Sequence, residues 1–426
     1  MSYKYQQYLE ALRKPFKKLV KIEFLQPDNS IAFSLDNNYI RSFKNKYDTR
    51  AFIQSGTLSV TMQNGQRRKA SITLSNLDGA FDYAVNKIWF GQKIRLLMGL
   101  KLPDGTDFYL QQGVFYISNP TSVFNPNQRT VTYNLVDKWA YLDGSLFGTL
   151  NGSYKIDLNE TNGSLWTAIR SVLKLNKINF STTQDKMLQV DNVNPVFTTF
   201  YDNKTGKEVR SNIPYSIIVN GDNATLADIL NELNGIIVGL IGYDQTGALR
   251  VDASQNDIDD NTKPILWNFT PNNSQLLGIS ETFKNSEVYN EIIVVGQNLA
   301  NSNIFGKVTN IDARSDTNVN LIGRRTYKES QPNFSKIQQC VDLAKFRLKR
   351  KTILQKSITV ESSQMFHLVE NNLITVMRTD KQGNPTEKHL INSFTLPIGE
   401  TGQMTINCTS VNDLPDLITD IETGTE

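Results

Sequence analysis

The sequence predicts a mainly β protein of several domains, in which two β-barrel domains flank a small α+β domain. The 426 residues exceed one ordinary domain and fit two to four domains of about 100–200 residues each. Short alternating runs separated by turn residues fill residues 16–150 and 279–412, a pattern typical of barrels or sandwiches. Amphipathic helical patterns lie between them, within residues 151–278.

The N-terminal part begins with a helical arm and continues as strands. Residues 3–15 place apolar side chains at helical spacing, and Pro15 ends this helix. Residues 1–15 are therefore an arm, and residues 16–150 form the first barrel. An Asn64-Gly65 pair between two alternating runs predicts a hairpin. Strands are expected at residues 17–25, 57–62, 70–74, 94–102, 108–117 and 129–139.

The middle segment, residues 151–278, is predicted to be an inserted α+β domain. Thr225 is followed three residues later by Asp228, which resembles a capping box at the start of a helix. Gly235 is the expected C-cap of the same helix. The expected elements are helices over residues 162–174 and 225–233 and a hairpin over residues 236–252.

The C-terminal part returns to strands, and residues 279–412 form the second barrel. Within it, residues 335–349 carry apolar side chains at helical spacing and are predicted to be a helix. Residues 413–426 are acidic and show no packing pattern, so we expect a mobile tail or a docking peptide. The two strand-rich parts share no repeat at the level of residues, so any duplication would be structural only. The strands expected here are residues 291–296, 355–361, 373–378, 388–396 and 403–411.

The composition excludes several classes of protein. A formal charge of +3 is too small for a protein that coats nucleic acid. Two cysteines exclude a disulfide scaffold, and two histidines leave little for metal or acid–base chemistry. Residues 1–16 have no continuous apolar core, and the longest apolar run, residues 236–241, is far shorter than the roughly 20 residues of a membrane span. We therefore expect a protein made and folded in a cytosol.

No motif indicates catalysis, so we name no catalytic, cofactor-binding or metal-ligating residue. A Ser–His–acid triad would need His367 or His389, and neither lies near a nucleophile-elbow motif. Zinc ligands are closely spaced in a sequence, whereas Cys340 and Cys408 lie far apart. We therefore interpret both as buried inert thiols.

Charged clusters are interpreted as solvated surface. The acidic cluster of Asp257, Asp259 and Asp260 lacks the glycine and glutamate positions of a calcium loop. The basic runs are also interpreted as solvated faces, and the alternative is contact with an acidic partner surface. These runs are residues 67–69, 324–325 and 345–351.

Four stretches of sequence, taken in order, carry a family resemblance. They are residues 90–95 with 113–117, 136–138 and 142–144; residues 225–230 continuing through 237–249; residues 288–296; and residues 321–325 with 368–376 and 390–407. Their order and spacing, rather than any one of them, resemble the central tail-hub proteins of tailed phages and phage-tail-like particles. This family is related to the hub part of type VI secretion spikes. The chain departs from it at residues 368–372, where relatives often have a turn proline or glycine.

The resemblance implies a homotrimeric structural protein of the virion, without enzymatic activity or cofactor. In such hubs each subunit contributes two tube-like barrels, so three chains present six units around a pore. The trimer adapts a sixfold tail tube to a threefold tip and forms part of the DNA conduit used in ejection. The implied partners are further copies of the chain, the tail-tube or distal tail protein, the tape-measure protein and the tip spike or fibre, while phage DNA passes without specific binding. The implied location is the tail tip or baseplate of the virion, after assembly in the host cytoplasm.

Two other functions stay open. A tail-tip module that binds a host cell-surface glycan is suggested by four aromatic residues of the middle segment, Phe197, Phe200, Tyr201 and Tyr215. A cell-wall hydrolase is suggested only by the implied location and by the supply of carboxylates. The sequence does not identify the tail type, the host, the neighbouring proteins, any glycan, or the residues that face the lumen or the subunit interfaces.

Overall fold

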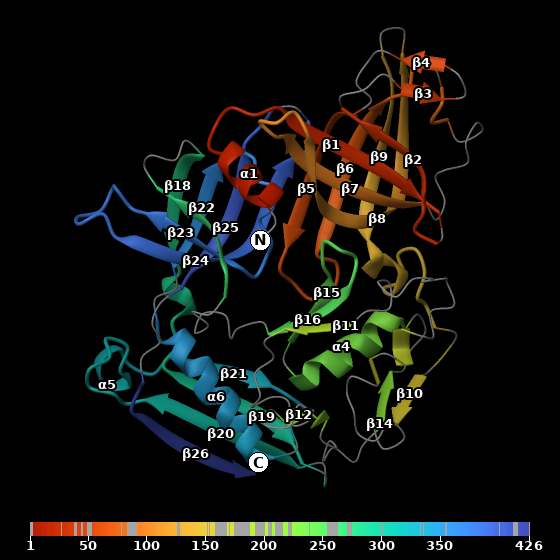
Figure 1. Ribbon diagram of the computed structural model, residues 1–426. Coiled ribbons are helices and arrows are strands. Elements are labelled where there is room, and N and C mark those ends of the chain that lie inside the picture. Colours follow the sequence, from red (N-terminus) through yellow and green to blue (C-terminus); the bar gives the residue numbers. More distant parts are fainter. Residues whose placement is uncertain are drawn as a thin grey trace.

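A computed structural model of the chain describes residues 3–82, 92–157, 168–173, 188–191, 201–202, 207–208, 216–219, 224–253, 263–270 and 275–425, apart from gaps of at most four residues within these ranges. The chain is mainly β, as predicted, with one very large sheet and few helices (Figure 1). The domain boundaries drawn from the sequence stay predictions.

The large sheet has 13 strands and contains strands from both predicted barrels. Its path runs β18-β22-β25-β24-β5-β6-β9-β8-β7-β1-β2, and β23 joins it through β24 and also pairs with β17. The strand bounds are β1 Lys18–Leu25, β2 Ile31–Asp36, β5 Ile53–Thr61, β6 Arg68–Ser75, β7 Lys93–Lys101, β8 Asp107–Asn125, β9 Gln128–Asp137, β17 Ile265–Phe269, β18 Leu276–Phe283, β22 Lys356–Ser362, β23 Leu373–Met377, β24 Thr386–Pro397 and β25 Met404–Ser410.

The sheet contains the same five-strand unit twice. The order β5-β6-β9-β8-β7 in the first unit matches β18-β22-β25-β24-β23 in the second, and the strands follow each other along the chain in the same sequence. All neighbours within both units are antiparallel. The register shifts between Ile53 and Ser55 in the first strand of one unit, and between Leu276 and Gly278 in that of the other. The duplication is structural, with different side chains at equivalent places.

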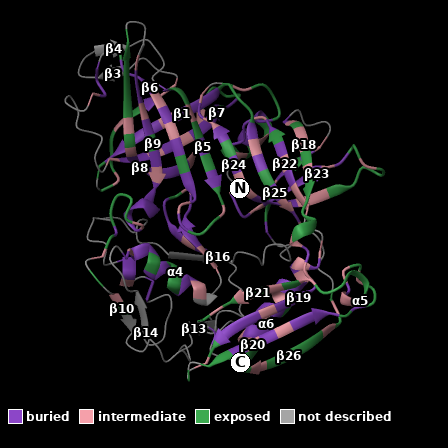
Figure 2. Ribbon diagram, turned by 180° about the vertical axis from the view of Figure 1, so that it is seen from behind, coloured by how far each residue is buried: buried purple, intermediate pink, exposed green. Residues whose placement is uncertain are grey.

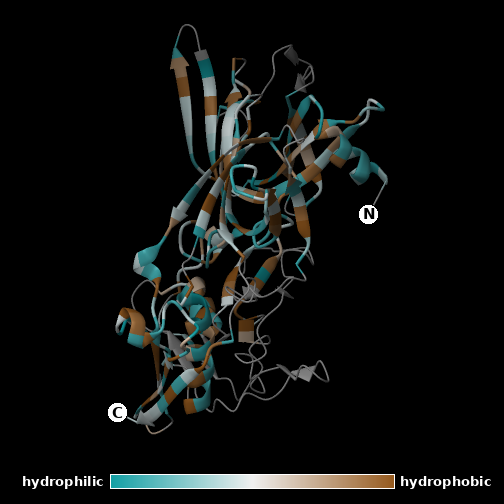
Figure 3. Cartoon of the chain, turned by 90° about the vertical axis from the view of Figure 1, so that its left-hand side faces the viewer, coloured by the Kyte–Doolittle hydropathy of each residue, from teal (hydrophilic) through white to brown (hydrophobic). Residues whose placement is uncertain are grey.

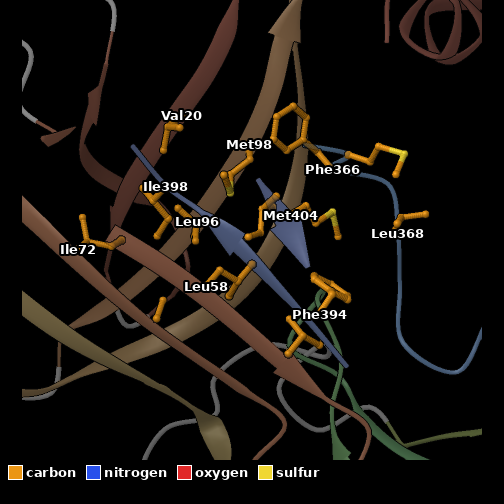
Figure 4. Close-up of a cluster of buried hydrophobic side chains, with 14 of the residues drawn as sticks. Val20, Leu58, Ile72, Leu96, Met98, Phe366, Leu368, Phe394, Ile398 and Met404 are labelled. Carbon is orange, nitrogen blue, oxygen red and sulfur yellow. The ribbon is translucent and has the colours of Figure 1, made fainter. Parts of the chain in front are cut away.

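The two units join through one strand pair and share one core. Residues Ser393–Pro397 of β24 pair antiparallel with Thr57–Thr61 of β5. Figure 4 shows Leu58 of the first unit and Phe394 of the second within the same group of buried side chains. Purple, buried stretches run along both units in Figure 2. Because their apolar faces pack together, the two units form one continuous body.

The N-terminal helix α1 spans Tyr3–Ala11 and is shorter than the predicted residues 3–15. A proline disfavours helical backbone at the residue before it, so Pro15 prevents the helix from continuing to residue 14. Tyr8 is fully buried and holds the helix against the shared core.

A second sheet takes three strands from the chain between β18 and β22 and its fourth strand from residues 419–425. Its order is β21-β19-β20-β26, with β19 Glu291–Gln297, β20 Asn303–Asn310, β21 Thr326–Ser330 and β26 Thr419–Thr425. Helix α6, Ile337–Lys351, packs on β19 and β20, close to the predicted helix 335–349. The small helix α5, Val319–Ile322, lies between β20 and β21 in the chain.

Of the two expectations for residues 413–426, a mobile tail or a docking peptide, the mobile tail is wrong for β26, which is docked on the chain's own second sheet. This strand pairs with the edge of β20 along its whole length, and Lys307 bonds Glu422 at 2.9 Å. Leu417 packs against the core of the inserted sheet. None of the side chains of β26 is fully buried, so the strand has no alternating sequence pattern of its own. In Figure 3 the chain ends lie far apart, with the C-terminal end beside this sheet.

The middle segment contains helix α4, Leu226–Ile237, and the hairpin β15–β16, Gly239–Tyr243 and Leu249–Ala253. The capping box is confirmed, because Thr225 N donates to Asp228 and Asp228 N donates to Thr225 Oγ1. Gly235 lies inside the helix rather than at its end, so the expected C-cap is wrong. Asn234 Nδ2 donates to the Gly239 carbonyl at 2.7 Å, which ties the last turns of the helix to the start of β15.

Shorter pairings complete the described part of the middle segment. Of the predicted helix 162–174, only residues 168–173 fall in described ranges; Ala168, Ile169, Val172 and Leu173 are helical and buried against α4. The other strands of the middle segment are β10 Tyr154–Asp157, β11 Leu188–Asp191, β12 Tyr201–Asp202, β13 Lys207–Glu208 and β14 Ser216–Val219. In the N-terminal part, β3 Arg41–Phe43 and β4 Lys46–Asp48 form a separate antiparallel pair.

Candidate functional site

Both histidines are buried and held by hydrogen bonds. His367 Nδ1 lies 3.1 Å from the Tyr8 hydroxyl, and its Nε2 lies 3.2 Å from the Leu266 carbonyl. His389 Nδ1 lies 3.1 Å from Ser410 Oγ. Burial lowers the pKa of each imidazole to about 4, so both rings are neutral at physiological pH. Their partners orient them as structural groups of the core.

The cysteines and the acidic cluster give no reactive constellation within the described residues. Cys340 and Cys408 are both buried. Burial raises the pKa of the Cys340 thiol to about 11 and that of Cys408 further, so both remain protonated thiols at neutral pH. The described ranges contain no group of three or more His, Cys, Asp or Glu that could hold a metal ion. The predicted loop of Asp257, Asp259 and Asp260 lies outside these ranges.

The first basic run is not a solvated face. Arg67 and Arg68 are 2% and 1% exposed, and only Lys69 points to solvent. Arg68 pairs with Glu370, which is itself buried and lies 302 residues further along the chain. Arg68 Nη1 also donates to the Gln112 carbonyl at 2.8 Å. The surface interpretation of this run is wrong because each guanidinium has a distant partner inside the fold.

The third basic run, residues 345–351, is partly structural as well. Arg347 Nε donates to Glu329 on β21 at 2.8 Å, which fixes α6 to the edge of its sheet. The Lys351 ammonium lies 4.1 Å from the centre of the Tyr327 ring, within the range of a cation–π contact. In the second run, Arg324 is mostly exposed and its Nε lies 3.3 Å from Glu291.

The turn of the β5–β6 hairpin joins the first unit to the middle segment. Asn64-Gly65 forms the predicted hairpin, and Gly65 has a φ of 89°, a backbone conformation that favours glycine. Gly65 N donates to the Ile241 carbonyl at 2.8 Å, and Asn64 Oδ1 accepts from Ile241 N at 3.1 Å. Arg67 Nη2 donates to the Leu240 carbonyl at 2.8 Å. The turn therefore covers backbone groups of β15.

Two buried charges lie beside this contact, where β9 ends and the short 3₁₀ helix Lys138–Tyr141 begins. Asp137 accepts backbone hydrogen bonds from Arg67, Arg68 and Trp139, which partly offset its burial. Burial still raises the pKa of Asp137 to about 6 and lowers that of Lys138 to about 7. Lys138 Nζ donates to the Gly247 carbonyl at 2.7 Å. This junction is polar and titratable.

A network of ion pairs links β18, β22 and β24 of the second unit with the segment that follows β23. Glu281 on β18 contacts Lys356 on β22, together with Arg378 and Lys381 after β23. Glu387 on β24 contacts the same three cations. Arg378 holds the pKa of Glu281 well below its usual range, so this carboxylate stays ionised. The network fixes the strands beside β18 in position.

Two strand edges stand out as candidate assembly surfaces. Among the described strands, the second half of β8 pairs only with β9, and β18 pairs only with β22. Both edges expose large apolar side chains, which is unusual for a free edge. Val123 and Phe124 of β8 are 43% and 77% exposed, and Leu277 and Phe283 of β18 are 51% and 54% exposed. Sequence reasoning missed both edges because an exposed strand and a core strand share one alternating pattern.

The glycan-binding interpretation is untested. Phe197, Phe200 and Tyr215 lie outside the described residues, and only the backbone of Tyr201 is described, in β12. No helix in the described ranges is both long and apolar enough to cross a membrane.

Comparison with known proteins gives matches by structure only. No family model matches the chain, and no curated protein matches its sequence. A tail protein from Neisseria meningitidis MC58 superposes with a TM-score of 0.56 at 9% identity, covering 93% of this chain and 97% of that one. The 43 kDa tail protein of prophage MuSo2 from Shewanella oneidensis gives a TM-score of 0.53 at 12% identity, covering 92% and 98%.

A third similar structure is a chain of the Francisella PdpA–VgrG complex in its lidded form. It gives a TM-score of 0.51 at 10% identity, covering 96% of this chain but 55% of that one. At these identities the likeness concerns the fold, and it extends over nearly the whole chain. The resemblance noticed in the sequence is thereby confirmed at the level of structure: the chain has the fold of phage and prophage tail proteins.

Proposed function

We propose that this chain is a structural protein of a phage-like tail, and that it acts as a homotrimeric hub between a sixfold tube and a threefold tip. The observation that carries the proposal is the five-strand unit that occurs twice in one chain. Three copies present six such units, which is the number that a sixfold tube requires. The similarity of fold to two tail proteins supports the same assignment.

The proposed role is non-enzymatic. The neutral, buried histidines and protonated thiols support this, because none of them is placed to act as a base or a nucleophile. In this proposal the trimer surrounds a pore through which phage DNA passes without specific binding. Its other partners are the tube or distal tail protein, the tape-measure protein and the tip spike or fibre, and it resides at the tail tip of the virion.

Negative-stain electron microscopy of the purified protein and of its native particle tests the proposal. We expect rings of three chains with a central hole and threefold or apparent sixfold symmetry, located at a tube tip. Compact particles without a pore in both preparations, or a monomer inside mature particles, would refute it. Clearing of cell-wall material in a zymogram would contradict the non-enzymatic role.

A further inference from the structure

We infer that neighbouring copies of this chain join edge to edge, by antiparallel pairing of β8 of one copy with β18 of the next. This inference rests on the proposed trimer and adds to it the strands and the register of the contact. The template is the joint inside one chain, where β24 of the second unit pairs with β5 of the first. The duplicated unit makes β8 the equivalent of β24, and β18 the equivalent of β5.

The equivalence holds residue by residue at the first strand of each unit. Both strands shift register near their start, between Ile53 and Ser55 in β5 and between Leu276 and Gly278 in β18. Beyond the shift, the residues correspond one to one without a further irregularity. Thr57 therefore corresponds to Ser280, and Ser59 corresponds to Thr282.

The same correspondence extends across the unit to β8 and β24. In one unit Ser71 lies opposite both Thr57 and Asn134, and in the other Thr359 lies opposite both Ser280 and Asn407. Asn134 and Asn407 are therefore equivalent, and so are Thr132 and Thr405, two residues earlier. Their partners on the next strand are Thr121 in β8 and Thr395 in β24. Each strand has a register shift on the N-terminal side of this threonine, between Ser118 and Thr121 in β8 and between Ile391 and Ser393 in β24.

The register of the contact between copies follows from the pairing of β24 with β5 inside one chain. Within the chain Thr395 lies opposite Ser59. Transferred to the equivalent residues, Thr121 of one copy lies opposite Thr282 of the next, and Val123 lies opposite Ser280. The pairing is uninterrupted over this short stretch, because β8 has no register shift after Thr121 and β18 has none after Gly278.

The side chains at the two edges suit this register. Phe124, which is 77% exposed, comes opposite Ile279 and diagonal to Leu277, which is 51% exposed. Side chains directly opposite and diagonal across an antiparallel pair are within contact distance, so the pairing buries the apolar surface that each edge exposes. Aromatic contact with aliphatic residues also favours strand pairing.

The geometry suits a closed ring. β18 lies at one side of the large sheet in Figure 1, and the projecting end of β8 lies at the opposite side. A contact between two different surfaces of the same chain is heterologous, and such a contact generates a ring when its rotation closes. The joint inside each chain and the joint between chains then alternate around that ring.

Engineered disulfides in the full-length chain test the register. Two variants carry in-register cysteine pairs, Thr121→Cys with Thr282→Cys and Val123→Cys with Ser280→Cys. The control pairs Thr121→Cys with Ser280→Cys, which are diagonal and about 7–8 Å apart, beyond the roughly 3.5–4.5 Å between Cβ atoms of a disulfide. All four substituted positions are exposed, and the native cysteines are both buried. Each oxidised sample is run on a non-reducing gel and its oligomeric state is measured by light scattering.

We expect at least one in-register variant to give covalent dimers and trimers that disappear on reduction, at least tenfold more abundant than in the control. A protein that is trimeric by light scattering but forms neither in-register crosslink would overturn this inference and leave the proposed trimer standing. Equal crosslinking of control and in-register variants would also overturn it. A protein that is monomeric at every concentration and inside native particles would remove the proposed function and this inference together.

Discussion

The buried pair of Arg68 and Glu370 offers the sharpest test of how the fold is held together. Arg68 belongs to β6 of the first unit, whereas Glu370 lies just before β23 of the second. We expect Arg68→Met and Glu370→Leu, made singly, each to destabilise the protein strongly. The double variant should be much less destabilised than the sum of the two.

The magnitude follows from burial. Arg68 is 1% exposed and Glu370 is 5% exposed, so neither charge regains water when its partner is removed. Removing one member of a buried pair leaves an uncompensated charge and costs about 3–5 kcal/mol, whereas replacing both by apolar residues of similar volume is often close to neutral. The expected coupling free energy is therefore several kcal/mol, far above the ~0.3–0.5 kcal/mol error of additivity.

Urea unfolding, followed by tryptophan fluorescence, measures the free energy of unfolding of the four proteins. The shared core makes the two units unfold together, because residues of both lie in one apolar cluster. Lys69→Met serves as a matched control, since this neighbour in the same strand is exposed. Single variants that lose less than 1 kcal/mol, or losses that simply add, would refute the assignment of a buried, mutually dependent pair.

Three further outcomes are expected. Burial lowers the pKa of Lys138 to about 7, so the folded protein binds fewer protons than the unfolded chain between about pH 7 and 10. The free energy of unfolding should therefore rise with pH across this window, by at most about 1.4 kcal/mol per pH unit. Urea midpoints measured across the window should show that Lys138→Met loses this rise. A Cβ on Gly242 would lie 2.5 Å from Arg67 Nε and 2.8 Å from a backbone oxygen, whereas one on Gly278 would meet only a flexible side chain at 3.3 Å. Gly242→Ala should therefore speed limited proteolysis of the middle segment, and Gly278→Ala should leave it unchanged. Deleting residues 419–426 should leave β20 as a free edge and cause concentration-dependent association in light scattering; a monodisperse truncated protein would contradict that role of β26.

The features predicted correctly from the sequence have local causes. The Asn64-Gly65 hairpin follows from a turn that needs glycine at a positive φ. The capping box of Thr225 and Asp228 follows from two side chains three residues apart. The mainly β character follows from alternating apolar and polar residues and from the turn residues between these runs. Both signals also extend over only a few residues.

The features that were missed depend on distant partners. Nothing near Arg68 in the sequence indicates that it pairs with a residue 302 positions away. The duplicated unit was implied only by the family resemblance and left no repeat of residues, because equivalent places carry unlike side chains, such as Leu58 and Glu281. The two units share the strand order and the register shift in their first strand, and these are properties of backbone pairing that no residue pattern records.

The joint between β24 and β5 has a consequence for synthesis of the chain. Leu58 lies opposite Leu396, roughly 340 residues later. At about 5–20 residues per second, β5 waits about 20–70 s for its neighbour while the chain is being made. During that interval its edge can accept β24 from another nascent chain on the same message. We expect such exchanged pairs to be the characteristic misfolded product of overexpression, and slower translation to increase their yield.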